Sequence, residues 1–177
     1  MGSKKPKKTI LLDADVVSHF ITGGAMYLLP NIFKYETVIL DKVYNELQNF
    51  RRKQKEVDNL VSQKLIRIID FPESNNGIKL EYFRLLQELI GDGEAACMAV
   101  ARYSKNIIGS SNLRDIKIYC EEHEIVYLTT IDFLCQALKT NKMDLEACNT
   151  FIRKVLGAGS RLPVSNMDSY QCRDTGL

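Results

Sequence analysis

Short apolar runs alternate along the chain with longer segments in which apolar residues recur at helical spacing. The apolar runs predict strands at 9–13, 37–40, 65–69, 106–110 and 124–128. The segments of helical period predict helices at 15–22, 25–35, 41–63, 78–90, 93–104, 113–123, 130–140 and 144–156. Strands that alternate with helices favour an α/β domain, in which helices flank a mostly parallel sheet of four or five strands.

Both ends of the chain differ in composition from the segment between them. Residues 1–8, MGSKKPKK, contain four lysines and predict a disordered basic arm. Residues 157–177 contain Gly, Ser and Pro and predict a loosely attached C-terminal tail. The 177 residues suit a single domain, which we expect to span 9–156.

Charge and hydropathy exclude two broad classes of protein. The net charge is +2, and without the four lysines of the arm it becomes −2, so the domain is not a basic nucleic-acid binder by bulk charge. No segment approaches the roughly 20 apolar residues that a membrane span needs. The pattern of a signal peptide is also missing, so we expect a cytoplasmic protein with no membrane partner.

Neither the cysteines nor the histidines have ligand-like spacing. The five cysteines are odd in number and form no C-x-x-C pair, which argues against a disulfide framework and a zinc ribbon. We therefore expect buried, reduced thiols. His19 and His123 are 104 positions apart, and we expect structural or surface roles for both.

Two aspartates follow the first predicted strand. Asp13 and Asp15 stand where the apolar run TILL ends, just before a helical period resumes. Asp15 could cap the next helix, or the pair could bind a hard cation. The carboxyl ends of parallel strands share one edge of a sheet, and ligands bind there.

Three further segments offer oxygen ligands for the same edge. Glu46 lies about one turn into the helix after the second strand, where a solvated position is the alternative. Glu94 follows the break GDG and opens a helix rich in alanine, where the helix dipole alone would favour a carboxylate. The segment Ser110-Ser111-Asn112 follows the fourth strand, with Asp115 one turn beyond, and helix capping would also explain it.

Taken in this order, these residues resemble the PIN-domain nucleases, including VapC-type toxins. The resemblance covers roughly residues 9 to 140 and rests on Asp13-x-Asp15, Glu46, Gly93-Glu94-Ala95-Ala96, Ser110-Ser111-Asn112 and the segment YLTTIDFLCQAL. It implies a three-layer PIN-like fold, metal-dependent endoribonuclease activity and a role as the toxin of a toxin–antitoxin pair. RNA as the substrate, an antitoxin partner and a homodimer are also implied by the resemblance alone.

The resemblance also implies roles for individual residues. Catalysis would depend on Asp13, Glu46, Glu94 and Asn112. Mg²⁺ or Mn²⁺ would be held by Asp13, Glu94, Asn112 and Asp115, with Asp15 and Asp132 as further contributors. Arg51, Arg52 and Arg114 are candidates for binding the RNA backbone, although Arg51 and Arg52 could equally belong to a solvated helix face. Asn112 departs from the family, which usually has a carboxylate there, so the site would have a neutral oxygen ligand and one negative charge fewer.

Two other functions fit parts of the pattern. LLDADVV resembles the nucleophile motif of haloacid-dehalogenase-like phosphohydrolases, with Asp13 attacking phosphate and Asp15 as the acid and base. GDGEAA resembles a later motif of that family, but it follows a helical period where a strand is required. The second alternative is a PIN-like binding or regulatory module that no longer cuts, which Asn112 favours.

Overall fold

The structure is a computed structural model that describes residues 8–177, so the predicted basic arm lies outside the described residues except for Lys8. Five strands form one sheet in the order β3-β2-β1-β4-β5, and every pair is parallel. Their bounds are β1 Thr9–Leu12, β2 Glu36–Leu40, β3 Arg67–Ile69, β4 Ile107–Gly109 and β5 Tyr127–Leu128. The α/β class and the parallel sheet are therefore confirmed.

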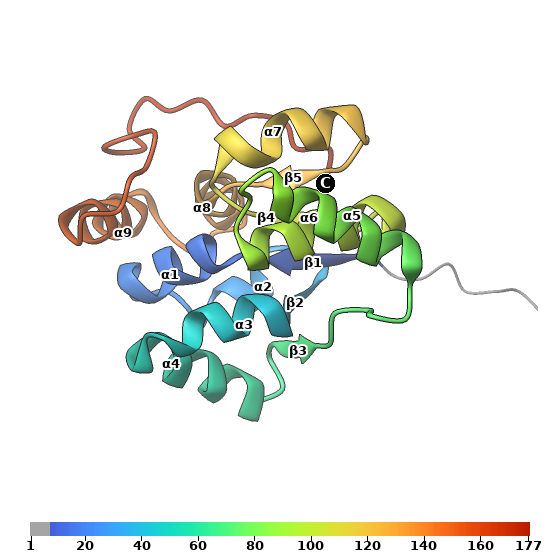
Figure 1. Ribbon diagram of the computed structural model, residues 1–177. Helices are drawn as coiled ribbons and strands as arrows, with labels where there is room; N and C mark the ends of the chain where they lie inside the picture. The colour runs from blue at the N-terminus through green and yellow to red at the C-terminus, as the bar shows by residue number, and fades with distance from the viewer. Residues whose placement is uncertain (1–7) are drawn as a thin grey trace, which may run out of the picture.

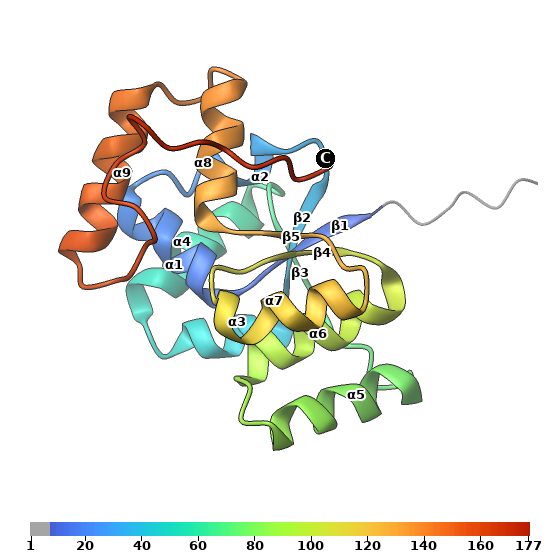
Figure 2. The same ribbon diagram turned by 90° about the horizontal axis from the view of Figure 1, so that it is seen from above.

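Helices cover both faces of the sheet and make a three-layer arrangement. Figures 1 and 2 show α5, α6 and α7 on one side, and α1, α8 and α9 on the other. The bounds are α1 Ala14–Gly23, α2 Leu29–Ile32, α3 Asp41–Gln48, α4 Arg51–Ser62, α5 Asn76–Gln87, α6 Asp92–Ser104, α7 Leu113–Glu122, α8 Thr130–Lys139 and α9 Leu145–Gly157. No helix within residues 8–177 is long and apolar enough to cross a membrane.

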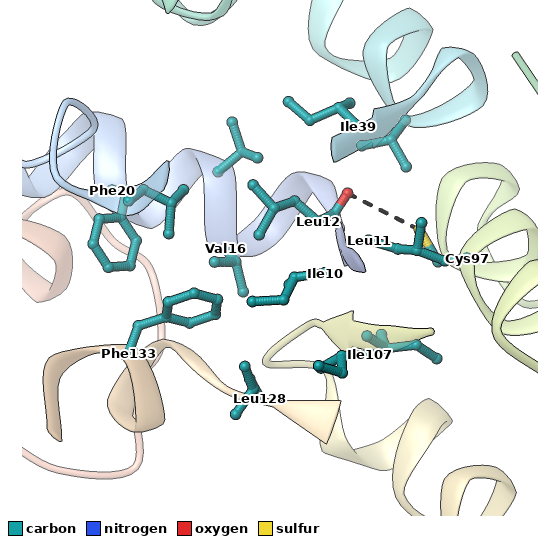
Figure 3. Packing of buried hydrophobic residues seen from close by; sticks show 14 of the residues in the cluster. Ile10, Leu11, Leu12, Val16, Phe20, Ile39, Cys97, Ile107, Leu128 and Phe133 are labelled. Atoms are coloured by element: carbon teal, nitrogen blue, oxygen red, sulfur yellow. Dashed lines mark hydrogen bonds between the residues drawn. The ribbon is translucent and has the colours of Figure 1, made fainter. Parts of the chain in front are cut away.

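The central strand β1 is the middle of the core. Ile10, Leu11 and Leu12 are fully buried, because helices cover the sheet on both sides. On one side Phe20 of α1 packs edge-on against Phe133 of α8, with ring centroids 5.8 Å apart. Figure 3 shows these rings beyond β1, on the side away from Cys97 of α6. The apolar run that predicted the first strand is thus buried except for Thr9, which is partly buried.

The predicted helix 41–63 is two helices in the structure. Helix α3 ends at Gln48 and α4 begins at Arg51, with Phe50 between them in a non-helical conformation and 56% exposed. Each helix buries its own pair of apolar residues, Val43 and Leu47 in α3 and Val57 and Leu60 in α4. The chain turns at Asn49 and Phe50, between the end of α3 and the start of α4.

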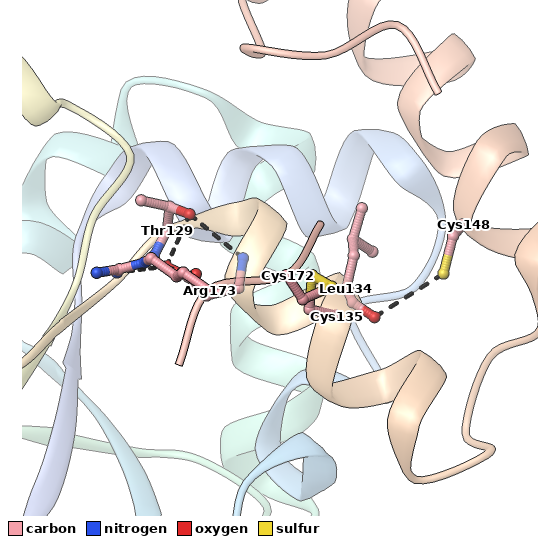
Figure 4. The surroundings of a disulfide bond; sticks show 7 residues. Thr129, Leu134, Cys135, Cys148, Cys172 and Arg173 are labelled. Carbon is pink, nitrogen blue, oxygen red and sulfur yellow. Dashed lines mark hydrogen bonds and ion pairs between the residues drawn. A yellow bond between two sulfur atoms is a disulfide. The ribbon is translucent and has the colours of Figure 1, made fainter. Parts of the chain in front are cut away.

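The C-terminal tail is attached more firmly than its composition predicted. Cys172 forms a disulfide with Cys135 of α8, and Arg173 pairs with Asp132, which is buried (Figure 4). Met167 is 4% exposed, and its N–H donates to Asn149 of α9. The expectation of a loose tail is wrong on these contacts, and reduced thiols are wrong for this cysteine pair. The remaining three, Cys97, Cys120 and Cys148, are free and buried as expected.

Candidate active site

Asp13 and Asp15 lie at the carboxyl end of β1. Asp13 is 6% exposed and is the N-cap of α1, where Oδ1 accepts a hydrogen bond from Ala14 N at 2.8 Å. Asp15 accepts a hydrogen bond from the N–H of Ser111, which lies 2.7 Å from Oδ2. Capping therefore accounts for Asp13, whereas Asp15 joins the first helix to the segment that follows the neighbouring strand β4.

Glu46 reaches this edge because α3 and α6 pack closely. Its Oε1 accepts a hydrogen bond from the N–H of Gly93 at 2.7 Å. A Cβ on Gly93 would lie 2.9 Å from Cγ2 of Val43 and 3.1 Å from Oε2 of Glu46. Only glycine permits this approach without displacing α3. Close packing of α6 against α3 thus explains the glycine before Glu94, and this contact could not be predicted from the sequence around it.

Glu94 meets the segment after β4 at the same edge. It is 6% exposed, and its carboxylate accepts hydrogen bonds from Ser110 Oγ at 3.3 Å and Asn112 Nδ2 at 3.0 Å. The same Asn112 nitrogen donates to Oδ2 of Asp115 at 2.7 Å. The amide of Asn112 therefore lies between two carboxylates, with its donor group toward both.

Three of these carboxyl groups, Asp13, Asp15 and Glu94, have raised pKa values. Burial raises the pKa of Asp13 well above its ordinary value, and the charges of Asp15 and Glu94 add to this. Burial, followed by the charge of Asp115 and then that of Asp15, raises the pKa of Glu94 to about 8. Burial also raises the pKa of Asp15 to about 6, although its backbone hydrogen bonds oppose the shift.

Asp115 is the exception in this cluster. The guanidinium of Arg114 beside it lowers the pKa of Asp115, and Arg114 Nε lies 3.0 Å from Oδ1. Shifted pKa values of this kind concentrate where several carboxylates share a poorly solvated region. We call Asp13, Asp15, Glu46, Glu94 and Asp115 the acidic cluster.

The side chains of the acidic cluster are of the type that binds a hard divalent cation, but they are not arranged around a common point as metal ligands would be. Carboxylate oxygens are the ligands that Mg²⁺ and Mn²⁺ prefer, and a cation would offset the mutual repulsion. Yet within residues 8–177 no group of three or more His, Cys, Asp or Glu side chains is arranged so that it could hold a metal ion. Asn112 turns its amide nitrogen, a donor, toward Glu94 and Asp115, whereas a cation would be bound by its amide oxygen.

The other residues predicted for the site are more dispersed. Arg114 touches the cluster through Asp115, whereas Arg51 and Arg52 line a pocket with Thr22. Thr22 is near the end of α1 opposite Asp13, about 14 Å away at the rise of an α-helix. Asp132 is not in the cluster, because it caps α8 and pairs with Arg173.

The geometry speaks against the phosphohydrolase alternative. That family requires its Gly-Asp-Gly motif after a strand, but Gly91 and Asp92 follow helix α5 and open α6. Asp92 accepts a hydrogen bond from the hydroxyl of Tyr82 on α5.

One contact of the site had no signal in the sequence. Thr130 at the start of α8 connects the segment after β4 to the interior: its N–H donates to Ser111 Oγ at 2.9 Å, and its hydroxyl lies 2.8 Å from His19 Nδ1. Burial, together with the charge of Lys53, lowers the pKa of His19 to about 4. A buried neutral imidazole in this place supports the structural role expected for His19.

Comparison with known proteins identifies no relative. No protein-family model matches the sequence, and no curated protein matches it. The functional interpretation therefore depends on the acidic cluster, on the sheet order that brings it together, and on the resemblance of its residues to the PIN-domain pattern.

Proposed function

We propose that the protein is a metal-dependent endoribonuclease of PIN type, which hydrolyses phosphodiester bonds with Mg²⁺ or Mn²⁺. One observation carries the proposal: the acidic cluster joins carboxylates from four helices at the carboxyl edge of an all-parallel sheet, where burial and neighbouring carboxylates raise the pKa values of Asp13 and Glu94. Such a cluster is costly to keep unless a cation compensates it. A phosphodiester substrate would give that cation a function.

The residues would divide the work as follows. Asp13, Glu94, Asn112 and Asp115 would hold the cation, which when bound neutralises phosphate charge and lowers the pKa of water. Glu46, fixed by the N–H of Gly93, would add negative charge on the α3 side. Asp15, bonded to Ser111 N, would position the segment that carries Asn112. Arg114 would contact the phosphate beside the cluster, and Arg51 with Arg52 would bind the backbone farther along.

Cleavage of a mixed single-stranded RNA pool tests the proposal. Wild type, Glu94→Gln and the control Glu146→Gln, which changes an exposed glutamate of α9, are compared with Mn²⁺, Mg²⁺ or EDTA. We expect cleavage that needs the metal, is lost in Glu94→Gln and persists in Glu146→Gln. Absence of cleavage by folded wild type with either metal would contradict it. A generic phosphatase substrate on the same plate detects phosphohydrolase activity instead.

The resemblance extends the proposal to a biological role. We propose a cytoplasmic toxin that pairs with an antitoxin protein and forms a homodimer. Expression should then arrest growth, and Asp13→Asn should relieve the arrest because it removes the carboxylate at the centre of the cluster. Unchanged toxicity of a stably folded Asp13→Asn protein would contradict this role.

A second candidate is a PIN-like module that binds or regulates without cutting. Asn112 favours it, because its amide donates to Glu94 and Asp115 and so offsets their repulsion without a cation. A Mn²⁺ titration separates the two candidates. A nuclease should bind the ion and lose binding in Glu94→Gln, whereas a module of this kind should bind weakly and equally in both proteins.

A further inference from the structure

A second pocket lies beside the acidic cluster, under the C-terminal tail. Its volume is about 470 Å³, within the range of pockets that hold small ligands. The segment after β4 contributes Ser111 and Leu113, the neighbours of Asn112 on each side. The tail contributes Arg161, Leu162, Pro163, Tyr170 and Arg173. The pocket therefore shares a wall with the acidic cluster, although its own charges are of opposite sign.

Two of its positive charges are free to bind a ligand. Lys117 of α7 and Arg161 of the tail line the pocket, and both are exposed. Neither side chain makes a hydrogen bond or ion pair with any residue in 8–177. Arg173 differs, because its guanidinium is held by Asp132 through hydrogen bonds of 2.8 and 2.6 Å. Arg173 thus builds the wall, while Lys117 and Arg161 remain available.

The pocket also has an aromatic side. Tyr127 of β5 and Tyr170 of the tail are half-buried in its lining. The guanidinium carbon of Arg173 lies 4.5 Å from the centroid of the Tyr127 ring, which fixes that ring in place. Figure 4 shows Arg173 alongside Thr129, at the start of α8, with the disulfide that holds the tail next to it. Free cations beside tyrosines are the combination that single-stranded nucleic acids bind, through phosphate and through base stacking.

We propose that this pocket binds one nucleotide of a single-stranded RNA, next to the phosphate at the acidic cluster. Lys117 and Arg161 contact its phosphate, and Tyr127 and Tyr170 contact its base. The identity of the ligand rests on the proposed function. The acidic cluster is negative and cannot itself bind the neighbouring nucleotide of the substrate, which this pocket would bind instead. The tail would then be part of the substrate site.

Binding measured without catalysis tests the pocket. The probe is a fluorescent single-stranded RNA oligomer in EDTA, followed by anisotropy over a range of salt. Lys117→Gln/Arg161→Gln is compared with Lys139→Gln/Lys154→Gln, which removes the same charge from exposed positions of α8 and α9. We expect Lys117→Gln/Arg161→Gln to weaken binding about tenfold or more. The slope of the logarithm of the binding constant against the logarithm of salt concentration should become shallower by about 1.4. The control variant should stay near wild type. Equal weakening in both would overturn the proposal.

Two further probes identify the ligand. Tyr170→Leu should weaken RNA binding roughly fivefold or more but leave the binding of inorganic polyphosphate unchanged, because only RNA has bases. Poly-glutamate should bind weakly and without dependence on Tyr170. Tight binding of poly-glutamate with weak binding of RNA would overturn the proposal in favour of an acidic protein partner.

The pocket and the nuclease can fail separately. Loss of RNA binding in Lys117→Gln/Arg161→Gln supports the pocket even where wild type cuts nothing, because the assay contains no metal. Conversely, metal-dependent cleavage by wild type together with unaltered RNA binding in Lys117→Gln/Arg161→Gln would support the nuclease proposal and overturn the proposal for the pocket. Thermal unfolding of each variant confirms that the fold is intact, as we expect for changes at exposed side chains.

Discussion

The amide nitrogen of Asn112 lies 3.0 Å from Oε2 of Glu94 and donates a hydrogen bond to it. The same nitrogen reaches Asp115, so a neutral side chain links two carboxylates that would otherwise repel. This contact determines how the site responds when Asn112 is replaced by the carboxylate that PIN-domain nucleases usually have.

We expect Asn112→Asp to destabilise the protein in EDTA by roughly 1–3 kcal/mol, because the change removes a donor and adds a like charge. Mn²⁺ should restore most of the loss, since a cation compensates the added carboxylate. Thermal unfolding with EDTA and with Mn²⁺ measures both effects. Asn59→Asp, on the exposed side of α4, adds the same charge and should show no response to Mn²⁺. An unchanged thermal midpoint of Asn112→Asp in both conditions would count against a cation site.

Stability in EDTA should fall as the pH rises. Glu94 has a folded-state pKa of about 8 against an ordinary 4.5, so between these values the folded state holds a proton that the unfolded state has released. The free energy of unfolding then decreases with pH across this window. Asp15, with a pKa raised to about 6, adds to the decrease at its lower end.

The measurement is urea unfolding in EDTA at pH 6 and pH 8. We expect wild type to lose up to about 2 kcal/mol between them, since one pKa unit corresponds to about 1.4 kcal/mol. Glu94→Gln, which cannot titrate, should lose less, and Glu146→Gln should behave like wild type. Higher stability of wild type at pH 8 would contradict the raised pKa values.

The parts of the fold that could be predicted are those with a local signal. The apolar run before Asp13 predicted a strand, and the helical spacing between the strands predicted helices. Both predictions were possible because burial on two faces and amphipathic spacing each leave a pattern in neighbouring residues. The position of Asp13 at a strand end also followed, and so did the expectation that Glu94 and Asn112 lie nearby, since parallel strands end at one edge.

The parts that could not be predicted depend on partners distant in the sequence. Gly93 donates to Glu46, which is 47 positions away, and Cys135 pairs with Cys172 at a separation of 37. An odd number of cysteines argued against that pair, but the count says nothing about which two thiols meet. The prediction of a single helix over 41–63 was wrong for another reason: the helical spacing of apolar residues continues across Phe50, although the chain turns there.

Gly93→Ala should destabilise the protein by about 1–3 kcal/mol, because its Cβ would overlap Val43 and force α3 and α6 apart. The same shift would move Glu46, so we expect any metal-dependent activity to fall with stability. Urea unfolding and the cleavage assay measure the two effects. Gly157→Ala in α9 is the control: its Cβ would meet nothing within 4 Å, and it should gain up to about 1 kcal/mol from helix propensity. Equal behaviour of the two variants would contradict the packing argument.

Reduction of the disulfide should destabilise the protein by roughly 3–4 kcal/mol, because Cys135 and Cys172 close a loop of 37 residues. Thiol titration in denaturant should find three free cysteines before reduction and five afterwards. Thermal unfolding with and without a dithiol reductant measures the loss. Cys135→Ser/Cys172→Ser should start at the reduced value and ignore the reductant. A wild-type midpoint that the reductant does not change would show that the disulfide adds nothing to the attachment of the tail.

Arg173→Gln should destabilise the protein by about 1–3 kcal/mol, because it leaves the carboxylate of Asp132 buried without its cation. The partial exposure of Arg173, 38% for its side chain, keeps the loss below that of a fully buried pair. The tail should also loosen, so a protease should cut beyond residue 157 faster than in wild type. Arg153→Gln breaks an exposed pair with Glu146 and should change neither measurement. If Arg173→Gln unfolds and is cut like Arg153→Gln, the ion pair adds nothing to the attachment of the tail, which then depends on its disulfide and on its other contacts, such as that of Met167. If both measurements move together only in Arg173→Gln, the ion pair with Asp132 is part of what keeps the tail over the start of α8.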